Sequence, residues 1–206
     1  MNMESFELSI PLFHVGKADQ NKNFVAGNKI PESKAKSNWA GKGVYFWDNL
    51  GNANYWLKTN DSRDKLSIVK ACLKMNDDCL LDLTDTDVVS EFKEWFLILR
   101  MENIIDKNDS YTYIGDIVNV IINVIIRIQQ KEFDDDPLLQ CFKDMKIYAI
   151  KIIGYYPKTI DRFLFNDDEE YINTNKKRPT LKSKVVYNIK NQNLLKQRTI
   201  VKNEEK

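Results

Sequence analysis

The sequence is poor in the residues that bind transition metals and form disulfides. It contains one histidine and three cysteines among 206 residues, and no two cysteines form a CxxC pair. A Cys/His zinc site needs several such ligands at close spacing, so the sequence argues against this class of site. An odd number of widely spaced cysteines is typical of reduced thiols, and we expect Cys72, Cys79 and Cys141 to be mostly buried in a cytoplasmic protein.

An excess of charge of either sign is also missing. The formal net charge is +1, with 30% charged and 43% apolar residues, which is ordinary for a globular protein without a general affinity for nucleic acid or membrane surfaces. The first residues carry Glu4 and Glu7 and no basic segment, so we expect no secretory signal. We predict a single domain over residues 1–206 that does not associate with membranes.

Hydrophobic patterns predict an α+β fold with strands near both ends of the chain and helices in the middle. Polar residues and glycines predict a loop over 15–42, and a second long polar loop over 157–183. A short helix is expected from Asp48 to Leu57, and a longer amphipathic helix starts near Asp85, where apolar residues recur at steps of three and four. The expected strands cover 8–14, 43–47, 67–75, 146–155 and 185–190, with a helical segment inserted at about 85–132.

The segment 117–128 is ambiguous by composition. Its β-branched residues favour a strand, but Asn119, Asn123 and Arg127 lie four residues apart and align in one stripe only on a helix. We predict a helix with a wide apolar face. It is too short to cross a bilayer, which needs roughly 20 apolar residues. It is therefore either a core helix or a surface for a partner protein, such as one that neutralises a toxin.

The most specific stretch is GKGVYFWD at residues 41–48, followed by Ala53-Asn54-Tyr55. Glycines on both sides of Lys42 allow a tight turn and a close approach of the backbone to a ligand. Tyr45 follows at the start of a predicted strand. Tyr45 and Tyr55 together can sandwich a flat heteroaromatic ring, at roughly 0.5–1.5 kcal/mol per aromatic pair beyond area burial.

These residues resemble the NAD-binding core of the ADP-ribosyltransferase superfamily, most closely its poly(ADP-ribose) polymerase-like branch, which reads G-K-G-[IV]-Y-F-x-D and then a serine before A-N-Y. The resemblance implies a split, mixed or antiparallel sheet core and NAD as substrate, bound by Gly43, Tyr45, Phe46 and Tyr55. In that family the first tyrosine stacks on nicotinamide and the serine binds its carboxamide. Asn52 stands in the serine position, after a spacer that is one residue shorter.

Upstream, residues 12–16 read LFHVG and resemble the family's L-x-H-G-[ST] at the end of its first strand. The family's histidine binds the adenosine ribose, and its glycine holds the nicotinamide amide through the backbone. His14 matches, while Val15 replaces that glycine and Gly16 follows. The resemblance implies that His14, Val15 and Gly16 contact NAD. A lone histidine would otherwise fit a structural role, but its order relative to Tyr45 favours the ligand site.

Residues 183–189 read SKVVYNI and resemble the family's E-Y-I-V-Y-D-I strand, so the family's glutamate falls on Ser183. That glutamate binds the nicotinamide ribose and supports chain elongation, and branch members without it are mono-transferases or inactive. A serine can bind the 2′-hydroxyl but cannot balance the charge of an oxocarbenium-like transition state. The acceptor can supply its own base, Glu169 or Glu170 can supply a carboxylate, or NAD is bound and turned over slowly.

The function implied by the resemblance is mono-ADP-ribosylation of a protein or nucleic acid, of a toxin or phage-defence type. Two alternatives keep the fold: an NAD- or ADP-ribose-binding module without transfer, and an NAD glycohydrolase. An RNA 2′-phosphotransferase would need an arginine-rich site around its histidine, yet no arginine precedes Arg63. A basic cluster favours a nucleic-acid acceptor, although such a run is also ordinary surface; it comprises Lys176, Lys177, Arg178, Lys182 and Lys184.

Overall fold

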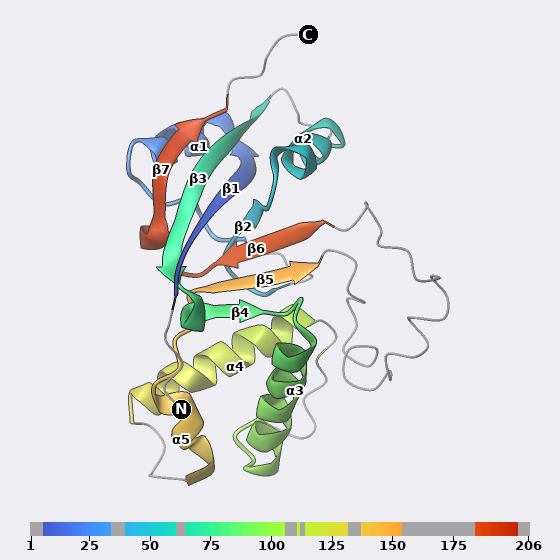
Figure 1. Cartoon of the computed structure of the whole chain (residues 1–206), viewed down its shortest axis with the longest axis vertical. Helices are drawn as coiled ribbons and strands as arrows, with labels where there is room; N and C mark the ends of the chain where they lie inside the picture. The colour runs from blue at the N-terminus through green and yellow to red at the C-terminus, as the bar shows by residue number, and fades with distance from the viewer. Residues whose placement is uncertain are drawn as a thin grey trace, which may run out of the picture.

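The computed structural model describes residues 6–33, 40–60, 65–105, 111, 114–131, 137–153 and 184–201, and these form one seven-stranded mixed sheet with helices packed against it (Figure 1). The strands are β1 Glu7–Lys17, β2 Val44–Trp47, β3 Leu66–Asn76, β4 Leu80–Asp82, β5 Ala149–Ile153, β6 Val185–Ile189 and β7 Leu195–Ile200. The α-helices are α1 Ala18–Val25, α2 Leu50–Lys58, α3 Thr86–Met101, α4 Ile114–Gln129 and α5 Gln140–Lys143.

The strand order is β4-β5-β6-β2-β1-β3-β7, and every pairing is antiparallel except that of β4 with β5. β1 and β3 pair along their whole length, but β1 and β2 share the single register pair Phe13↔Trp47. In Figure 1 the strands β5 and β6 run across the direction of β1 and β3. The sheet therefore consists of two halves, β1-β3-β7 and β2-β6-β5-β4, that are joined narrowly where β1 meets β2.

Two hydrophobic clusters hold this sheet. The first includes Trp47, the buried side of α3, and nearly all of the apolar face of α4. The second includes Leu12 of β1, Phe46 of β2 and Phe24 of α1. Because Trp47 and Phe46 are neighbours in β2, the two clusters lie on opposite faces of the sheet. The fold thus sets α1 on one face and the α3–α4 pair on the other.

The helical prediction for 117–128 is confirmed, and the buried face of α4 makes it a core helix. Its β-branched residues remain helical because that face is completed by packing, which outweighs intrinsic propensity. Asp85 caps α3, with its carboxylate 2.9 Å from the backbone nitrogen of Asp87. Within the described ranges, no helix combines the length and the apolar character that crossing a membrane would require.

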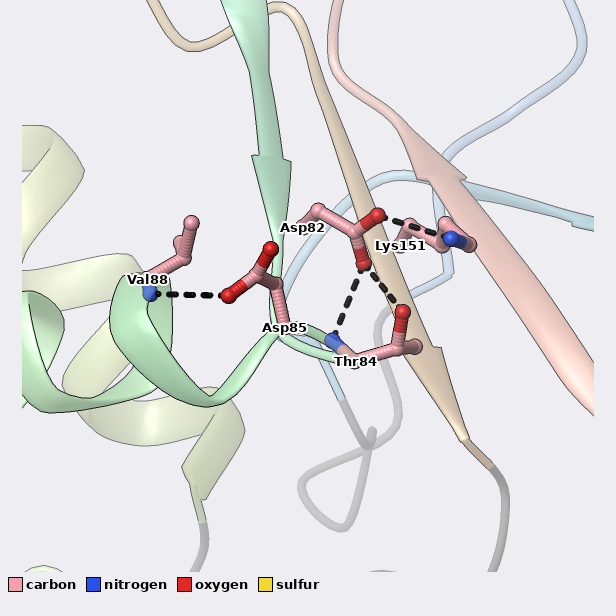
Figure 2. A network of polar contacts seen from close by, with 5 residues as sticks. All are labelled: Asp82, Thr84, Asp85, Val88 and Lys151. Carbon is pink, nitrogen blue, oxygen red and sulfur yellow. Dashed lines mark hydrogen bonds and ion pairs between the residues drawn. The ribbon is translucent and has the colours of Figure 1, made fainter.

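A small polar network fixes the connection from β4 to α3 (Figure 2). One carboxylate oxygen of Asp82 forms an ion pair with Nζ of Lys151 in β5, at 2.7 Å. Its other oxygen accepts hydrogen bonds from the backbone and hydroxyl of Thr84. Asp85 then begins the helix. All of these groups serve the turn, so this carboxylate is structural.

The α+β class, the mixed sheet and the insertion of helices between β4 and β5 are confirmed. The prediction of a loop over 15–42 is wrong at its start, because β1 continues to Lys17 and α1 follows. Of the α1 residues, only Asn21 and Phe24 are buried, so the hydrophobic pattern of this helix is too sparse to detect. The hydrophobic pattern likewise does not reveal β4, β7 and α5, because they are short or lie at an edge of the sheet.

The cysteine prediction is only partly right. No disulfide joins the three cysteines, all of which lie in the described ranges; Cys79 is buried, but Cys72 is half-buried and Cys141 is exposed. Cys141 lies in α5, whose buried residue is its neighbour Phe142. The helix turns the following position inward, which leaves the thiol at the surface.

Candidate functional site

The single histidine lies where the two halves of the sheet separate. Beyond the pair Phe13↔Trp47, β1 and β2 no longer pair, and the imidazole of His14 spans the gap. Its Nδ1 is 2.7 Å from the backbone oxygen of Tyr45, and its ring centroid is 5.2 Å from that of Phe46. A carbonyl oxygen can only accept, so Nδ1 carries the proton and Nε2 is left as an acceptor.

Burial lowers the pKa of His14 below its usual value of 6.5, and the hydrogen bond to Tyr45 opposes this only in part. The imidazole is therefore neutral near physiological pH. A neutral imidazole with Nδ1 fixed on the backbone presents Nε2 to a hydroxyl donor. This is the chemistry required to bind a ribose hydroxyl.

We predict that the His14 imidazole titrates below pH 6.5 as the Nδ1–H tautomer. With one histidine in the chain, nitrogen-detected NMR across pH reports this residue alone. Because the folded pKa lies below the unfolded value, the unfolded chain binds the proton more readily as pH falls below 6.5. The contribution of His14 to stability is thus present above pH 6.5 and is lost on acidification. Titration above 6.5, or an Nε2–H tautomer, would contradict this geometry.

A second acceptor lies beside Nε2. A Cβ added to Gly16 would sit 2.5 Å from His14 Nε2 and 3.3 Å from Asn21 Oδ1. Asn21 is fully buried, and its amide nitrogen donates to Ser67 O at 2.8 Å. Within the described part of the chain, its Oδ1 has no hydrogen-bond partner. Sequence reasoning missed Asn21, because nothing in its sequence neighbourhood distinguishes it from the surrounding polar residues.

The turn at Gly41-Lys42-Gly43 is hydrogen-bonded to side chains from elsewhere in the fold. The Tyr45 hydroxyl accepts from the Ala40 amide at 3.0 Å and donates to Gly41 O at 2.7 Å. Asn188 of β6 is fully buried and donates to Ala40 O at 2.8 Å and Gly41 O at 2.9 Å. Lys190 also donates to this turn, at Ala40 O and Lys42 O. Six hydrogen bonds from these three side chains therefore set its shape.

The two glycines of this turn are required by neighbouring protein atoms. Gly41 and Gly43 have φ of +72° and +148°, in the region that favours glycine. A Cβ on Gly41 would sit 2.3 Å from Asn119 Oδ1 of α4, and one on Gly43 would sit 1.8 Å from Asn188 Oδ1. The glycines were expected to let the backbone approach a ligand. The structure offers another reason for them, because the side chains of Asn119 and Asn188 occupy the space that a Cβ would need.

Two ionisable side chains that are hydrogen-bonded to this turn have shifted pKa values. Burial raises the pKa of Tyr45 to about 12, despite the hydrogen bond from Ala40. Burial also lowers the pKa of Lys190 to about 8, with Glu32 opposing the shift. The Tyr45 phenol is therefore neutral and committed to the turn. Any contribution it makes to a ligand comes from its ring and not from proton transfer.

His14 and Tyr45 meet through the backbone, but their side chains face different surroundings. The His14 ring lies beside Phe46, in the second cluster, whereas Tyr45 packs against the first. Val15 also packs against the first cluster. Tyr55 lies on α2 with 53% of its surface exposed. The sandwich of a ring between Tyr45 and Tyr55 stays a prediction.

Asn52, in the family's serine position, lies in the first turn of α2. Its side-chain nitrogen donates to Asp48 Oδ1 at 2.8 Å, and its backbone nitrogen is capped by Asn49 at 2.8 Å. Asp48 is held in turn by β6, since its backbone nitrogen is 3.3 Å from Val185 O. The amide oxygen of Asn52 is the atom left to take a carboxamide.

The residues predicted to supply or replace the missing glutamate are not described. Ser183, Glu169 and Glu170, with the basic residues from Lys176 to Lys182, lie outside the described ranges, as does the loop 157–183. Lys184 is described. In the parts of the chain that the structure covers, no three His, Cys, Asp or Glu side chains are grouped so as to hold a metal ion. No protein-family model, curated protein or solved structure matches this chain.

Proposed function

We propose that the chain is an ADP-ribosyltransferase-like domain that binds NAD and transfers one ADP-ribose unit to a protein or nucleic acid, releasing nicotinamide. The observation that carries this proposal is the state of His14. Its Nδ1–H is fixed on Tyr45 O at 2.7 Å, in the gap between β1 and β2, and Nε2 is left as an acceptor for a ribose hydroxyl. The assignment to a toxin or phage-defence setting rests on the sequence resemblance alone.

The chemistry of transfer is compatible with such a site. The bond from ribose C1′ to the nicotinamide nitrogen breaks, its electron pair stays with nicotinamide, and an oxocarbenium-like sugar is attacked by the acceptor. Nicotinamide leaves as a neutral molecule, so no strong general acid is needed. The raised pKa of the Tyr45 phenol and the lowered pKa of His14 leave neither group as an acid at neutral pH. Positioning then supplies most of the rate.

The same features support binding without transfer as the second candidate. Asp48, a carboxylate beside the start of β6, already accepts from the side-chain nitrogens of Asn49 and Asn52. Its charge is thus engaged in holding α2 rather than directed at a sugar cation. An NAD glycohydrolase differs from the transferase only in having water at the acceptor position.

The test is nicotinamide release from NAD by the purified chain, with and without a lysate of protein and nucleic acid. His14→Asn keeps a donor near Nδ1 but removes the Nε2 acceptor, and we expect release to fall about 100-fold, as a lost positioning contact can cause. Lys196→Ala, at an exposed position of β7, is the matched control and should leave release unchanged.

The outcomes separate the candidates. Release that depends on His14 and rises with lysate supports a transferase, and protease or nuclease digestion then identifies the acceptor class. Release that depends on His14 but not on lysate points to the glycohydrolase. NAD binding without release over hours moves the assignment to the binding module. Neither binding nor release would return His14 to a purely structural role.

A further inference from the structure

A lysine just before β6 covers the ring of Tyr55, one of the two tyrosines predicted to sandwich the nicotinamide ring. Lys184 directly precedes β6, and its Nζ lies 3.4 Å from the centroid of the Tyr55 ring on α2. An ammonium over a tyrosine ring is attracted by the negative face of the π system. This face of the Tyr55 ring is therefore occupied by a cation of the protein itself.

The fold places Lys184 and Tyr55 beside each other. α2 is anchored by buried Ala53 and by Trp56, whose ring centroid is 5.7 Å from that of Trp47. The start of β6 is fixed on the end of β2, because the Asp48 backbone nitrogen is 3.3 Å from Val185 O. α2 and the start of β6 are therefore both fixed near the end of β2, which brings Tyr55 and Lys184 together.

The charge of the ligand makes this contact consequential. The nicotinamide ring of NAD is a pyridinium cation, and it would stack on the same kind of surface that Lys184 occupies. Two cations cannot share one ring face, because stacking requires contact and like charges repel. After the C1′–nitrogen bond breaks, the electron pair neutralises nicotinamide, and the ring loses its cationic attraction to tyrosine.

We propose that Lys184 is a specificity-determining residue that competes with the cationic nicotinamide ring for Tyr55. This inference rests on the proposed function. Lys184 weakens the binding of oxidised NAD, and its return to the Tyr55 ring displaces neutral nicotinamide after transfer. The residue thereby adjusts the site toward product release at the expense of affinity.

The experiment compares Lys184→Met, which keeps the length of the side chain and removes its charge, with Lys184→Arg, which keeps a cation. Dissociation constants for NAD and for NADH, whose nicotinamide ring is neutral, are measured by calorimetry. We expect Lys184→Met to bind NAD about 2- to 5-fold more tightly, the effect of an exposed cation–π contact, with NADH changed less and Lys184→Arg close to wild type. Unchanged or weaker NAD binding in Lys184→Met would overturn the proposal.

A second measurement keeps this result distinct from failure of the proposed function. If NAD binds neither the wild type nor Lys184→Met, the proposed function falls, and the competition is judged with 1-methylnicotinamide, a pyridinium without the nucleotide. NMR follows the chemical shift of the Lys184 ε-methylene protons, which the Tyr55 ring moves upfield. Titration with 1-methylnicotinamide should remove this upfield shift, and neutral nicotinamide should change it less. Equal response to both compounds, or none to either, would show that no cation competes for the ring.

Discussion

Replacing Gly43 with alanine is expected to destabilise the protein by about 3 kcal/mol or more, which approaches the whole stability of a marginal domain. Two effects combine at this position. The φ of +148° is strained for any residue with a Cβ, at about 1–3 kcal/mol. The new methyl group would also lie 1.8 Å from Asn188 Oδ1 and 3.1 Å from the backbone oxygen of Ile189, and such overpacking costs about 1–3 kcal/mol.

Urea unfolding measures this effect, and Gly27→Ala is its matched control. Gly27 also has a positive φ, +106°, but a Cβ there meets no atom of the described residues within 4 Å. The control thus isolates backbone strain, and the difference between the two variants reports the collision with Asn188. Equal losses in the two variants would mean that β6 does not pack over Gly43 as described.

Gly41 and Gly43 have a role that the sequence reveals only in part. Their spacing around Lys42 is visible in the sequence and correctly indicates a tight turn. The partners that make glycine necessary, Asn119 and Asn188, are distant in sequence and become neighbours only when α4 and β6 pack around the turn. The same holds for Lys190, whose burial depends on this packing. Long-range contacts of this kind have no local sequence signal.

Element types were readable where the hydrophobic pattern was strong. α3 and α4 each bury a continuous face, and β3 alternates in much of its length, so their periodicities are clear. α1 buries only Asn21 and Phe24 and is otherwise mostly polar. Its position depends on the hydrogen bond from the Asn21 side chain to Ser67 O of β3. A helix held by one asparagine and one phenylalanine resembles a loop when only the sequence is read.

The contact between His14 and Tyr45 is predictable from the sequence in its residues but not in its geometry. His14 and Tyr45 were identified as a pair, and the structure joins them by one hydrogen bond. However, this bond uses the backbone of Tyr45, and the phenol that the resemblance assigns to nicotinamide is tied to Ala40 and Gly41. Which atom of a residue faces a ligand depends on strand separation, and this is a property of the assembled sheet.

Gly16→Ala is expected to lower nicotinamide release about 100-fold while leaving the fold largely intact, provided that the chain has the proposed activity. Gly16 carries no positive φ, so alanine adds no backbone strain. Its methyl group would instead lie 2.5 Å from His14 Nε2, and the imidazole must turn away from Tyr45 O to relieve the contact. The loss of that bond costs about 1 kcal/mol of stability, a small effect beside the displacement of the atom that we propose binds the ribose.

Initial rates of nicotinamide release and urea unfolding, measured on the same preparations, test this separation of activity from stability. Gly51→Ala is the matched control, because a Cβ there meets only the side chain of Asn49, at 3.2 Å, and α2 continues through this position. NMR of the single histidine should report a changed tautomer or a raised pKa in Gly16→Ala and not in Gly51→Ala. If Gly16→Ala moves the His14 signals but retains full release, His14 has no part in binding NAD. In that case the imidazole serves only to bridge β1 and β2.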